Sequence, residues 1–345
     1  MSKIGYTPEH PLLFDGAMGT LFAAMPGRAG ERCEGASLTH PGEISAIHHA
    51  YLEAGARAIK TNTFGLGTEL AQGNEALAGE LIAAASRLAL EAAAPYGALV
   101  FADLGPIPGD SLRSPEELFL LQAEQFVSAG VTHFLVETLS SDEGIPQLAA
   151  WLEANCPEAF LIVSFAVGPD GFTREGLSGR ALLKRTAALP GVDGVGFNCM
   201  SGPHHLLSLV RGLELEGTML SVMPNAGYPT VLGRRTAYQG TPDYFAQQMA
   251  QILRAGASIA GGCCGTTPEH IARLARLLRE EPAAPAAVVS GPVQAPVRAP
   301  AGTDRLWSKL ERGRRPWRWS WIPRPTTISP PSCPAWAPCG TRGPT

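Results

Sequence analysis

Residues 133–167, HFLVETLSSDEGIPQLAAWLEANCPEAFLIVSFAV, contain one complete strand–helix–strand unit. The runs at 133–138 and 160–167 are short and almost continuously apolar, which is typical of strands that are buried on both faces. Between them, residues 145–156 carry apolar side chains at helical spacing. Alternation of a strand, a helix and a second strand predicts a parallel sheet with helices packed on it.

The same alternation extends over most of the chain. The expected strands are residues 12–16, 58–64, 98–105, 133–138, 160–167, 194–199, 220–227 and 258–265. The expected helices between and after them include residues 41–56, 74–94, 114–130, 145–156, 242–256 and 268–280. Eight such units in about 270 residues predict an α/β fold of the (β/α)8 TIM-barrel type. The alternative is a doubly wound sheet, but GAMGTLF (16–22) lacks the spacing of a dinucleotide-binding loop.

Composition narrows the class of protein. The 345-residue chain has a net charge of −4, which gives no indication of nucleic-acid binding. No apolar run reaches the roughly 18 residues that would predict a membrane span. The first ten residues contain no apolar segment, so we expect no secretory signal and a cytoplasmic location. The 7 cysteines are then expected to be reduced and available for metal binding or catalysis.

The composition changes after residue 281. We expect a barrel domain over residues 1–281, a Pro/Ala-rich linker over 282–303 and an irregular, disordered tail over 304–345. Five of the six tryptophans lie beyond residue 300, where prolines are too frequent for a packed core. The tail is either a basic disordered segment or the product of a shifted reading frame over a former second domain.

Polar residues follow seven of the expected strands, at the ends that converge on the mouth of a barrel. Cys199 ends the sixth expected strand, and Cys263 and Cys264 lie at the end of the eighth. Three thiolates that converge on one point suit zinc and leave a fourth position open. The alternatives are a buried, apolar Cys199 and a packed or disulfide-bonded Cys263–Cys264 pair. Three thiolate ligands would favour alkyl transfer to a substrate sulfur over hydrolysis.

Several segments resemble the homocysteine S-methyltransferase family over about residues 10–280. They are LLFDGAMGTLF (12–22), SAIHHAYLEAGARAIKTNTFG (45–65), FLVET (134–138), GFNC (196–199), PNAG (224–227) and GGCCGTTPEHI (261–271). The family includes the homocysteine-binding barrel of cobalamin-dependent methionine synthase, betaine–homocysteine methyltransferase, enzymes that use S-methylmethionine, and fusions to methylenetetrahydrofolate reductase. The resemblance implies a (β/α)8 barrel that activates homocysteine as a zinc-bound thiolate. This thiolate attacks a donor methyl group to give methionine.

The resemblance also implies which residues form the site. The zinc ligands would be Cys199, Cys263 and Cys264, and the residues that bind the amino-acid end of homocysteine would be Asp15, Gly16 and Glu137. Carboxylates suit the substrate ammonium group, and backbone N–H groups near Gly16 suit its carboxylate. Asn225 is a candidate fourth zinc ligand. Lys60 departs from the family, in which many members carry an acidic residue before TNTF.

The sequence says less about the methyl donor than about the residues of the site. Thr138 stands where the betaine-using branch has Tyr, which favours the methionine synthase type over betaine. Candidate donors are methylcobalamin or methyltetrahydrofolate supplied by separate cobalamin or folate modules, or S-methylmethionine. Two other functions compete with the enzyme. One is a non-catalytic zinc- or thiol-binding barrel left from a truncated multidomain enzyme. The other is a zinc hydrolase, which would need His ligands at strand ends where this sequence has none.

Overall fold

The structure is a computed structural model, which describes residues 5–227, 229–232, 235–238 and 240–280. The linker and the tail that the sequence predicts beyond residue 281 lie outside the described residues.

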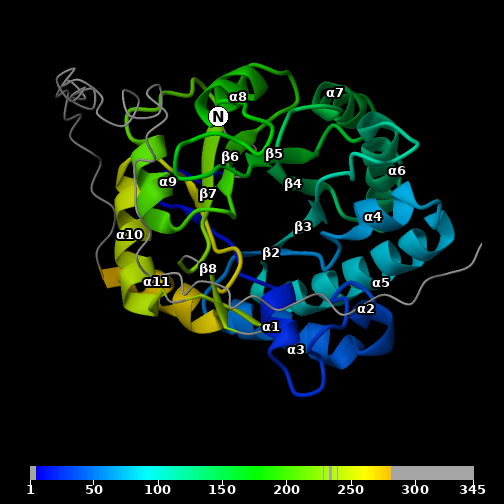
Figure 1. Ribbon diagram of the computed structural model, residues 1–345, viewed down its shortest axis with the longest axis horizontal. Helices are drawn as coiled ribbons and strands as arrows, with labels where there is room; N and C mark the ends of the chain where they lie inside the picture. The colour runs from blue at the N-terminus through cyan, green and yellow to red at the C-terminus, as the bar shows by residue number, and fades with distance from the viewer. Residues whose placement is uncertain (1–4, 228, 233–234, 239, 281–345) are drawn as a thin grey trace, which may run out of the picture. The chain divides into compact units, whose positions relative to one another are not determined.

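Eight parallel strands form the barrel, in the order β1-β10-β7-β6-β5-β4-β3-β2 (Figure 1). They are β1 (Leu12–Leu13), β2 (Ala58–Lys60), β3 (Leu99–Leu104), β4 (His133–Leu139), β5 (Phe160–Phe165), β6 (Gly194–Asn198), β7 (Met219–Met223) and β10 (Ile259–Ala260). The ring closes between β1 and β2 through a parallel bridge from Phe14 to Ala58, and the Asp15 N–H donates to the Ala58 carbonyl at 3.0 Å. The predicted TIM barrel is therefore confirmed.

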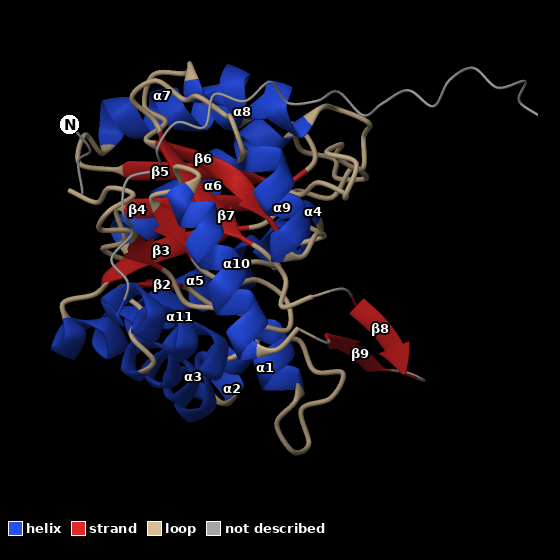
Figure 2. Cartoon of the chain, turned by 90° about the vertical axis from the view of Figure 1, so that its left-hand side faces the viewer, coloured by secondary structure: helices blue, strands red, loops and turns tan. Residues whose placement is uncertain are grey.

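Helices surround the strands in the views of Figures 1 and 2. They are α1 (Gly19–Ala23), α2 (Ala36–Thr39), α3 (Pro41–Glu53), α4 (Leu66–Ala71), α5 (Glu75–Ala93), α6 (Pro115–Ser128), α7 (Ile145–Asn155), α8 (Gly179–Ala187), α9 (Pro203–Val210), α10 (Pro242–Arg254) and α11 (Pro268–Glu280). Two begin at side-chain caps. Ser114 forms a capping box with Glu117, and the Thr241 hydroxyl accepts a hydrogen bond from the Tyr244 N–H at 3.3 Å. Such caps satisfy amide groups that have no partner within the helix.

The interior of the barrel is filled by side chains. Phe14 packs on Phe101 with ring centroids 4.7 Å apart, and Phe101 also packs edge-on against Phe160. A larger apolar cluster contains residues from both the strands and the surrounding helices. Because the interior is a packed core, space for a ligand is expected at the carboxyl ends of the strands.

Four of the expected strands end three or more residues early at that end. Residues 12–16, 58–64, 220–227 and 258–265 leave the ladder after two to five residues, and their last residues form loops at the barrel mouth. The structure also contains an unexpected antiparallel hairpin, β8 (Pro229–Leu232) and β9 (Arg235–Tyr238), shown at one side of the barrel in Figure 2. The β-branched residues Thr230, Val231 and Thr236 in these two segments are a strand signal that the sequence analysis missed.

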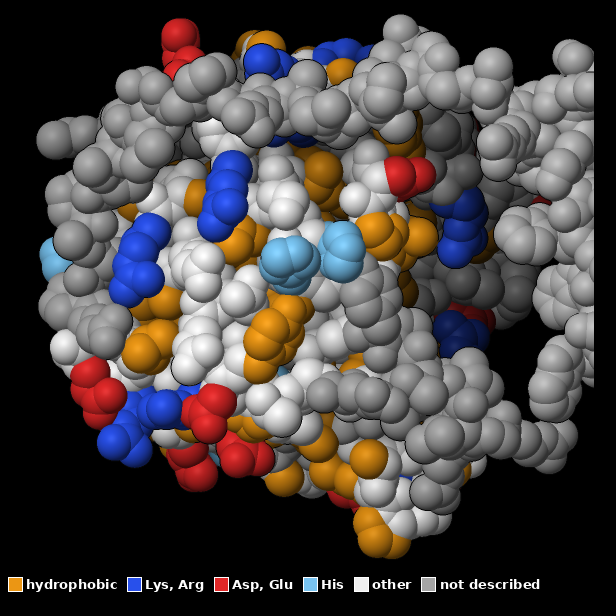
Figure 3. Space-filling view, turned by 60° about the vertical axis from the view of Figure 1, so that its left-hand side comes forward, with side chains coloured by type: hydrophobic (Ala, Val, Ile, Leu, Met, Phe, Trp, Pro, Cys, Tyr) orange, Lys and Arg blue, Asp and Glu red, His pale blue; other side chains and the backbone are white. Residues whose placement is uncertain are grey.

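On the face of the molecule shown in Figure 3, basic and acidic side chains are interspersed with apolar ones. Within the described part of the chain, every helix is too short or too polar to cross a membrane.

Candidate metal and substrate site

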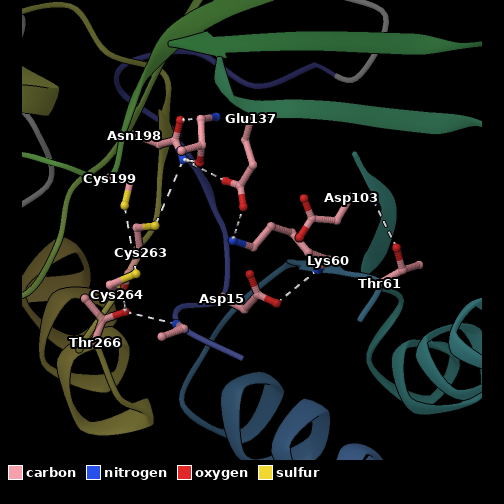
Figure 4. Close-up of polar contacts among 12 residues, drawn as sticks. Asp15, Lys60, Thr61, Asp103, Glu137, Asn198, Cys199, Cys263, Cys264 and Thr266 are labelled. Atoms are coloured by element: carbon pink, nitrogen blue, oxygen red, sulfur yellow. Dashed lines mark hydrogen bonds and ion pairs between the residues drawn. The ribbon is translucent and has the colours of Figure 1, made fainter. Parts of the chain in front are cut away.

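Three thiols meet at the barrel mouth (Figure 4). Cys199 directly follows β6, and Cys263 and Cys264 follow β10, with β7 between these two strands. Their Sγ atoms all lie within 4.8 Å of one another, and the Sγ atoms of Cys199 and Cys264 are 3.8 Å apart. All three cysteines are free. The cluster can therefore hold a metal ion.

The backbone fixes the loop that carries the adjacent cysteines. The Cys263 N–H donates to the Pro224 carbonyl at 2.8 Å, and the Ala226 N–H donates to the Cys264 carbonyl at 3.0 Å, so the end of β7 holds both residues. Thr266 holds the loop from the other side. Its hydroxyl donates to the Cys263 carbonyl at 2.7 Å and accepts from the Ala17 N–H at 3.1 Å. These bonds tie the thiol cluster to the end of β1.

The chemistry of these donors fits a thiophilic metal such as zinc. Thiol hydrogen bonds from Cys199 and Cys263 lower the pKa of Cys264, so the cluster already favours a thiolate. Asn225 directly precedes Ala226, whose N–H donates to the Cys264 carbonyl, and the buried Asn225 Oδ1 atom has no hydrogen-bond partner among the described residues. A buried oxygen without a partner is costly unless a ligand satisfies it. The three clustered thiols are the kind of ligand set that zinc prefers.

Backbone strain is concentrated beside the thiols. Thr138, Cys199 and Met200 are the non-glycine residues with positive φ in the described chain, at 65°, 54° and 47°. Such conformations persist only where the surroundings enforce them. Asn198 enforces that of Thr138, because its Oδ1 accepts from the Thr138 N–H at 2.9 Å and its Nδ2 donates to the Thr138 hydroxyl at 2.8 Å. The same Nδ2 donates to Glu137 Oε2 at 3.1 Å.

A cavity of about 430 Å³ connects the thiols with a group of buried charges. Lys60, Asp103 and Glu137 line it together with the three cysteines. Asp15 and Gly16 are not among its lining residues. Asp15 lies behind Lys60, whose N–H donates to Asp15 Oδ2 at 3.0 Å. Gly16 packs so closely that a Cβ atom would lie 2.5 Å from the Thr266 hydroxyl, so its small size has a structural reason.

The buried charges influence one another strongly. Lys60 Nζ lies 3.4 Å from Glu137 Oε1, and both side chains are almost fully buried. Burial lowers the pKa of Lys60, but the carboxylates of Glu137, Asp15 and Asp103 outweigh it and leave that pKa well above its usual value. Burial raises the pKa of Asp15 to about 7 and also raises the pKa of Asp103. The cavity therefore contains the Lys60–Glu137 ion pair beside carboxyl groups whose neutral forms burial favours.

Replacing Asp15 by Asn should change how the stability of the metal-free protein depends on pH. Because the folded-state pKa of about 7 exceeds the ordinary 3.8, the folded protein binds this proton more tightly than the unfolded chain. The free energy of unfolding should then fall as pH rises through this window. Asp15→Asn should unfold at higher urea than wild type at pH 8, by roughly 1–4 kcal/mol, and this difference should shrink toward pH 5.

Exposed Asp110→Asn is the control, and its stability should follow that of wild type at every pH. Parallel curves for wild type and Asp15→Asn between pH 5 and pH 8 would show that the folded environment does not raise this pKa.

Sequence reasoning did not assign roles to Asn198, Thr266 or Tyr238. Asn198 stands in GFNC and Thr266 in GGCCGTT, so both lie within segments that the sequence analysis quoted. Tyr238 ends the unexpected hairpin, and its hydroxyl hydrogen-bonds to the Cys264 thiol. A signal for Tyr238 existed only in the strand signal of this hairpin.

A second cavity, of about 940 Å³, lies next to the first. Phe64, Thr138 and Cys199 line both cavities. Met200 and Leu112, which is 99% exposed, also line the second one. The three thiols therefore line the smaller cavity, and Cys199 also lines the larger one beside it.

The chain is similar to known proteins over the same region. The sequence model of a family described as homocysteine S-methyltransferase matches residues 12–278. Methionine synthase of Mycobacterium tuberculosis is 33% identical over 296 residues, which cover 77% of this chain and 24% of that protein. Methionine synthase of Mycobacterium leprae is 31% identical over 263 residues, 69% of this chain and 21% of that protein. The chain thus spans about a quarter of the length of these curated relatives.

Solved structures are similar to this chain over the same region. The metallated form of the homocysteine methyltransferase MmuM from Escherichia coli superposes with a TM-score of 0.61 at 27% identity, over 77% of this chain and 96% of that one. A type I 3-dehydroquinate dehydratase from Clostridium difficile, at 13% identity and a TM-score of 0.50, shares the fold alone. The matched residues 12–278 include the whole described barrel except its extreme ends. The chain therefore belongs to the homocysteine S-methyltransferase family.

Proposed function

We propose that this barrel transfers a methyl group to the sulfur of homocysteine and thereby forms methionine. The observation that carries the proposal is the single 430 Å³ cavity in which three clustered thiols face buried charged side chains. Homocysteine has one thiol, which suits the cysteine cluster at one wall of this cavity, and one charged amino-acid end, which suits the charged side chains at the other wall. Cys199, Cys263 and Cys264 would hold zinc, and Asn225 is a candidate fourth ligand before substrate enters. Bound zinc would favour the thiolate form of the substrate and keep its sulfur nucleophilic.

The charged wall would orient the substrate. Glu137 lines the cavity and is held in place by Asn198 and Lys60, so its carboxylate can accept the substrate ammonium group. Asp15 would support this wall from behind, through its hydrogen bond with the Lys60 N–H. In the reaction, a sulfur–methyl bond forms while the bond from the methyl group to the donor breaks, and the donor leaves with the bonding electron pair.

The second cavity would admit the methyl donor, because Thr138 and the Cys199 thiol line both it and the first cavity. Candidate donors are methylcobalamin or methyltetrahydrofolate presented by separate modules, or S-methylmethionine. The similarity to methionine synthases, which are much longer than this chain, supports partner modules. Cys33, Cys199, Cys263 and Cys264 are free thiols, which supports a reducing compartment such as the cytoplasm.

The test is methionine formation from homocysteine by the zinc-loaded full chain, with each of the three donors supplied in turn. Methionine with at least one donor, lost in the absence of zinc, is the expected result. Stoichiometric zinc and homocysteine binding without methionine from any donor would instead indicate a non-catalytic thiol-binding barrel.

Replacing Glu137 by Gln should weaken homocysteine binding by roughly 1–3 kcal/mol, the usual range for a hydrogen bond to a charged group. The amide removes the negative charge but keeps the size of the side chain. Calorimetric titration of the zinc-loaded variant measures the loss. The matched control is Glu143→Gln, an exposed carboxylate on the loop after β4, which should bind homocysteine as wild type does. Unchanged affinity in Glu137→Gln would remove Glu137 from the substrate site.

A further inference from the structure

Lys60 is a cation placed within the substrate cavity. Lys60 ends β2 at the barrel mouth, is only 6% exposed to solvent, and lines the 430 Å³ cavity. Among the described residues that line this cavity, it is the single Lys or Arg. A buried lysine is retained only where other groups compensate its charge. Figure 4 shows its ammonium group beside Glu137, with Asp15 and Asp103 close by.

The ammonium group has capacity for a further partner. A lysine Nζ carries three N–H donors, and the contact with Glu137 at 3.4 Å uses one of them. Asp15 bonds instead to the backbone N–H of Lys60. A carboxylate that entered the cavity beside Glu137 could therefore accept a hydrogen bond from Nζ. This contact would be charge-assisted, which makes it stronger than one between neutral groups.

The sequence analysis offered backbone N–H groups near Gly16 for the substrate carboxylate, and the backbone from Ala17 to Gly19 does line the cavity. The Ala17 N–H, which follows Gly16, already donates to the Thr266 hydroxyl at 3.1 Å. Gly16 itself is wedged against Thr266 and Tyr51 and is not among the residues that line the cavity. A substrate carboxylate placed there would have to displace a buried hydrogen bond. At Lys60 it would meet a positive charge.

We infer that Lys60 binds the α-carboxylate of the substrate, so that the Lys60–Glu137 pair recognises both charges of a thiol-containing amino acid. The inference rests on the proposed function and assigns the residue that selects amino acids over simple thiols. The carboxylate lies on Lys60 Nζ, the ammonium group lies on Glu137, and the carbon chain extends toward the thiol cluster. Lys60 thus becomes a specificity-determining residue, although it departs from the acidic residue common in the family.

The test combines truncated ligands with variants of the zinc-loaded full chain, measured by calorimetry. The ligands are homocysteine, 3-mercaptopropylamine, which lacks the carboxylate, and 4-mercaptobutanoate, which lacks the ammonium group. Wild type should bind homocysteine roughly 10- to 150-fold more tightly than 3-mercaptopropylamine, the factor expected for a hydrogen bond between charged groups. Lys60→Met should lose a similar factor for homocysteine and for 4-mercaptobutanoate, yet bind 3-mercaptopropylamine as tightly as wild type or more so.

Controls separate this effect from damage to the fold. Lys60→Arg keeps the charge and should keep most of the preference for ligands with a carboxylate, even if Lys60→Met unfolds. Lys184→Met removes an exposed lysine on α8 and should change no affinity. The wild-type comparison of homocysteine with 3-mercaptopropylamine needs no variant at all.

The outcomes distinguish the two proposals. If Lys60→Met weakens all three ligands equally, or if wild type binds 3-mercaptopropylamine as tightly as homocysteine, the role of Lys60 is wrong while the proposed function stands. If wild type binds none of the three thiols, both proposals are overturned. Loss confined to the two carboxylate-containing ligands supports the inference.

Discussion

Replacing Cys263 by Ala is expected to abolish zinc binding and methyl transfer while the barrel remains folded. Cys263 lies at the centre of the proposed ligand set, next to Cys264 in sequence and close in space to Cys199. Two thiols cannot hold zinc as three do, because structural and catalytic zinc sites generally use at least three protein ligands. The barrel should tolerate the change, since the clusters that form its core do not include this residue.

Zinc content after dialysis, circular dichroism and thermal unfolding measure these two effects separately. Cys156→Ala is the matched control: it removes a buried thiol at the end of α7, within the apolar core and outside the thiol cluster. This control should be somewhat less stable than wild type but should still bind one zinc ion per chain. Full zinc retention in Cys263→Ala would show that this cysteine is not a ligand.

The sequence predicts the start of each barrel strand well, and there is a physical reason for this. Parallel strands buried on both faces must be continuously apolar, so segments such as 133–138 and 160–167 stand out from their surroundings. The carboxyl ends of the strands are less predictable. In residues 58–64 the ladder ends at Lys60, and the polar side chains that follow bond elsewhere: the Asn62 amide donates to the Cys33 carbonyl and the Thr63 hydroxyl donates to the Asp103 carbonyl of β3.

The positions of the three cysteines were predictable because strand order alone brings them to one rim. The network that fixes them was not. Thr266 binds the Ala17 N–H, a partner 249 residues away, and this contact exists only after the first and last strands have closed the ring. Asn198 is similar, because from the end of β6 it holds Thr138 and Glu137 of β4, which is separated from β6 by β5. One sequence without a structure contains no signal for such pairs.

Homocysteine should bind the zinc-loaded protein far more tightly than homoserine, which differs only in carrying a hydroxyl group in place of the thiol. Both ligands present the same ammonium and carboxylate groups to Lys60 and Glu137, so the charged wall cannot distinguish them. The thiol can lose its proton to become a soft sulfur ligand, whereas a hydroxyl group keeps its proton near neutral pH. We expect a difference of roughly 100-fold or more, equivalent to about 2.7 kcal/mol.

The most direct test of the account is a pair of calorimetric titrations of the zinc-loaded full chain, with homocysteine and with homoserine, in buffers of different ionisation enthalpy. The account predicts tight binding of homocysteine with release of about one proton near neutral pH, because metal binding requires the deprotonated thiol. It predicts weak binding of homoserine without proton release. Equal affinities for the two ligands, with no dependence of the measured heat on the buffer, would contradict the claim that this barrel activates a substrate thiol at its cysteine cluster.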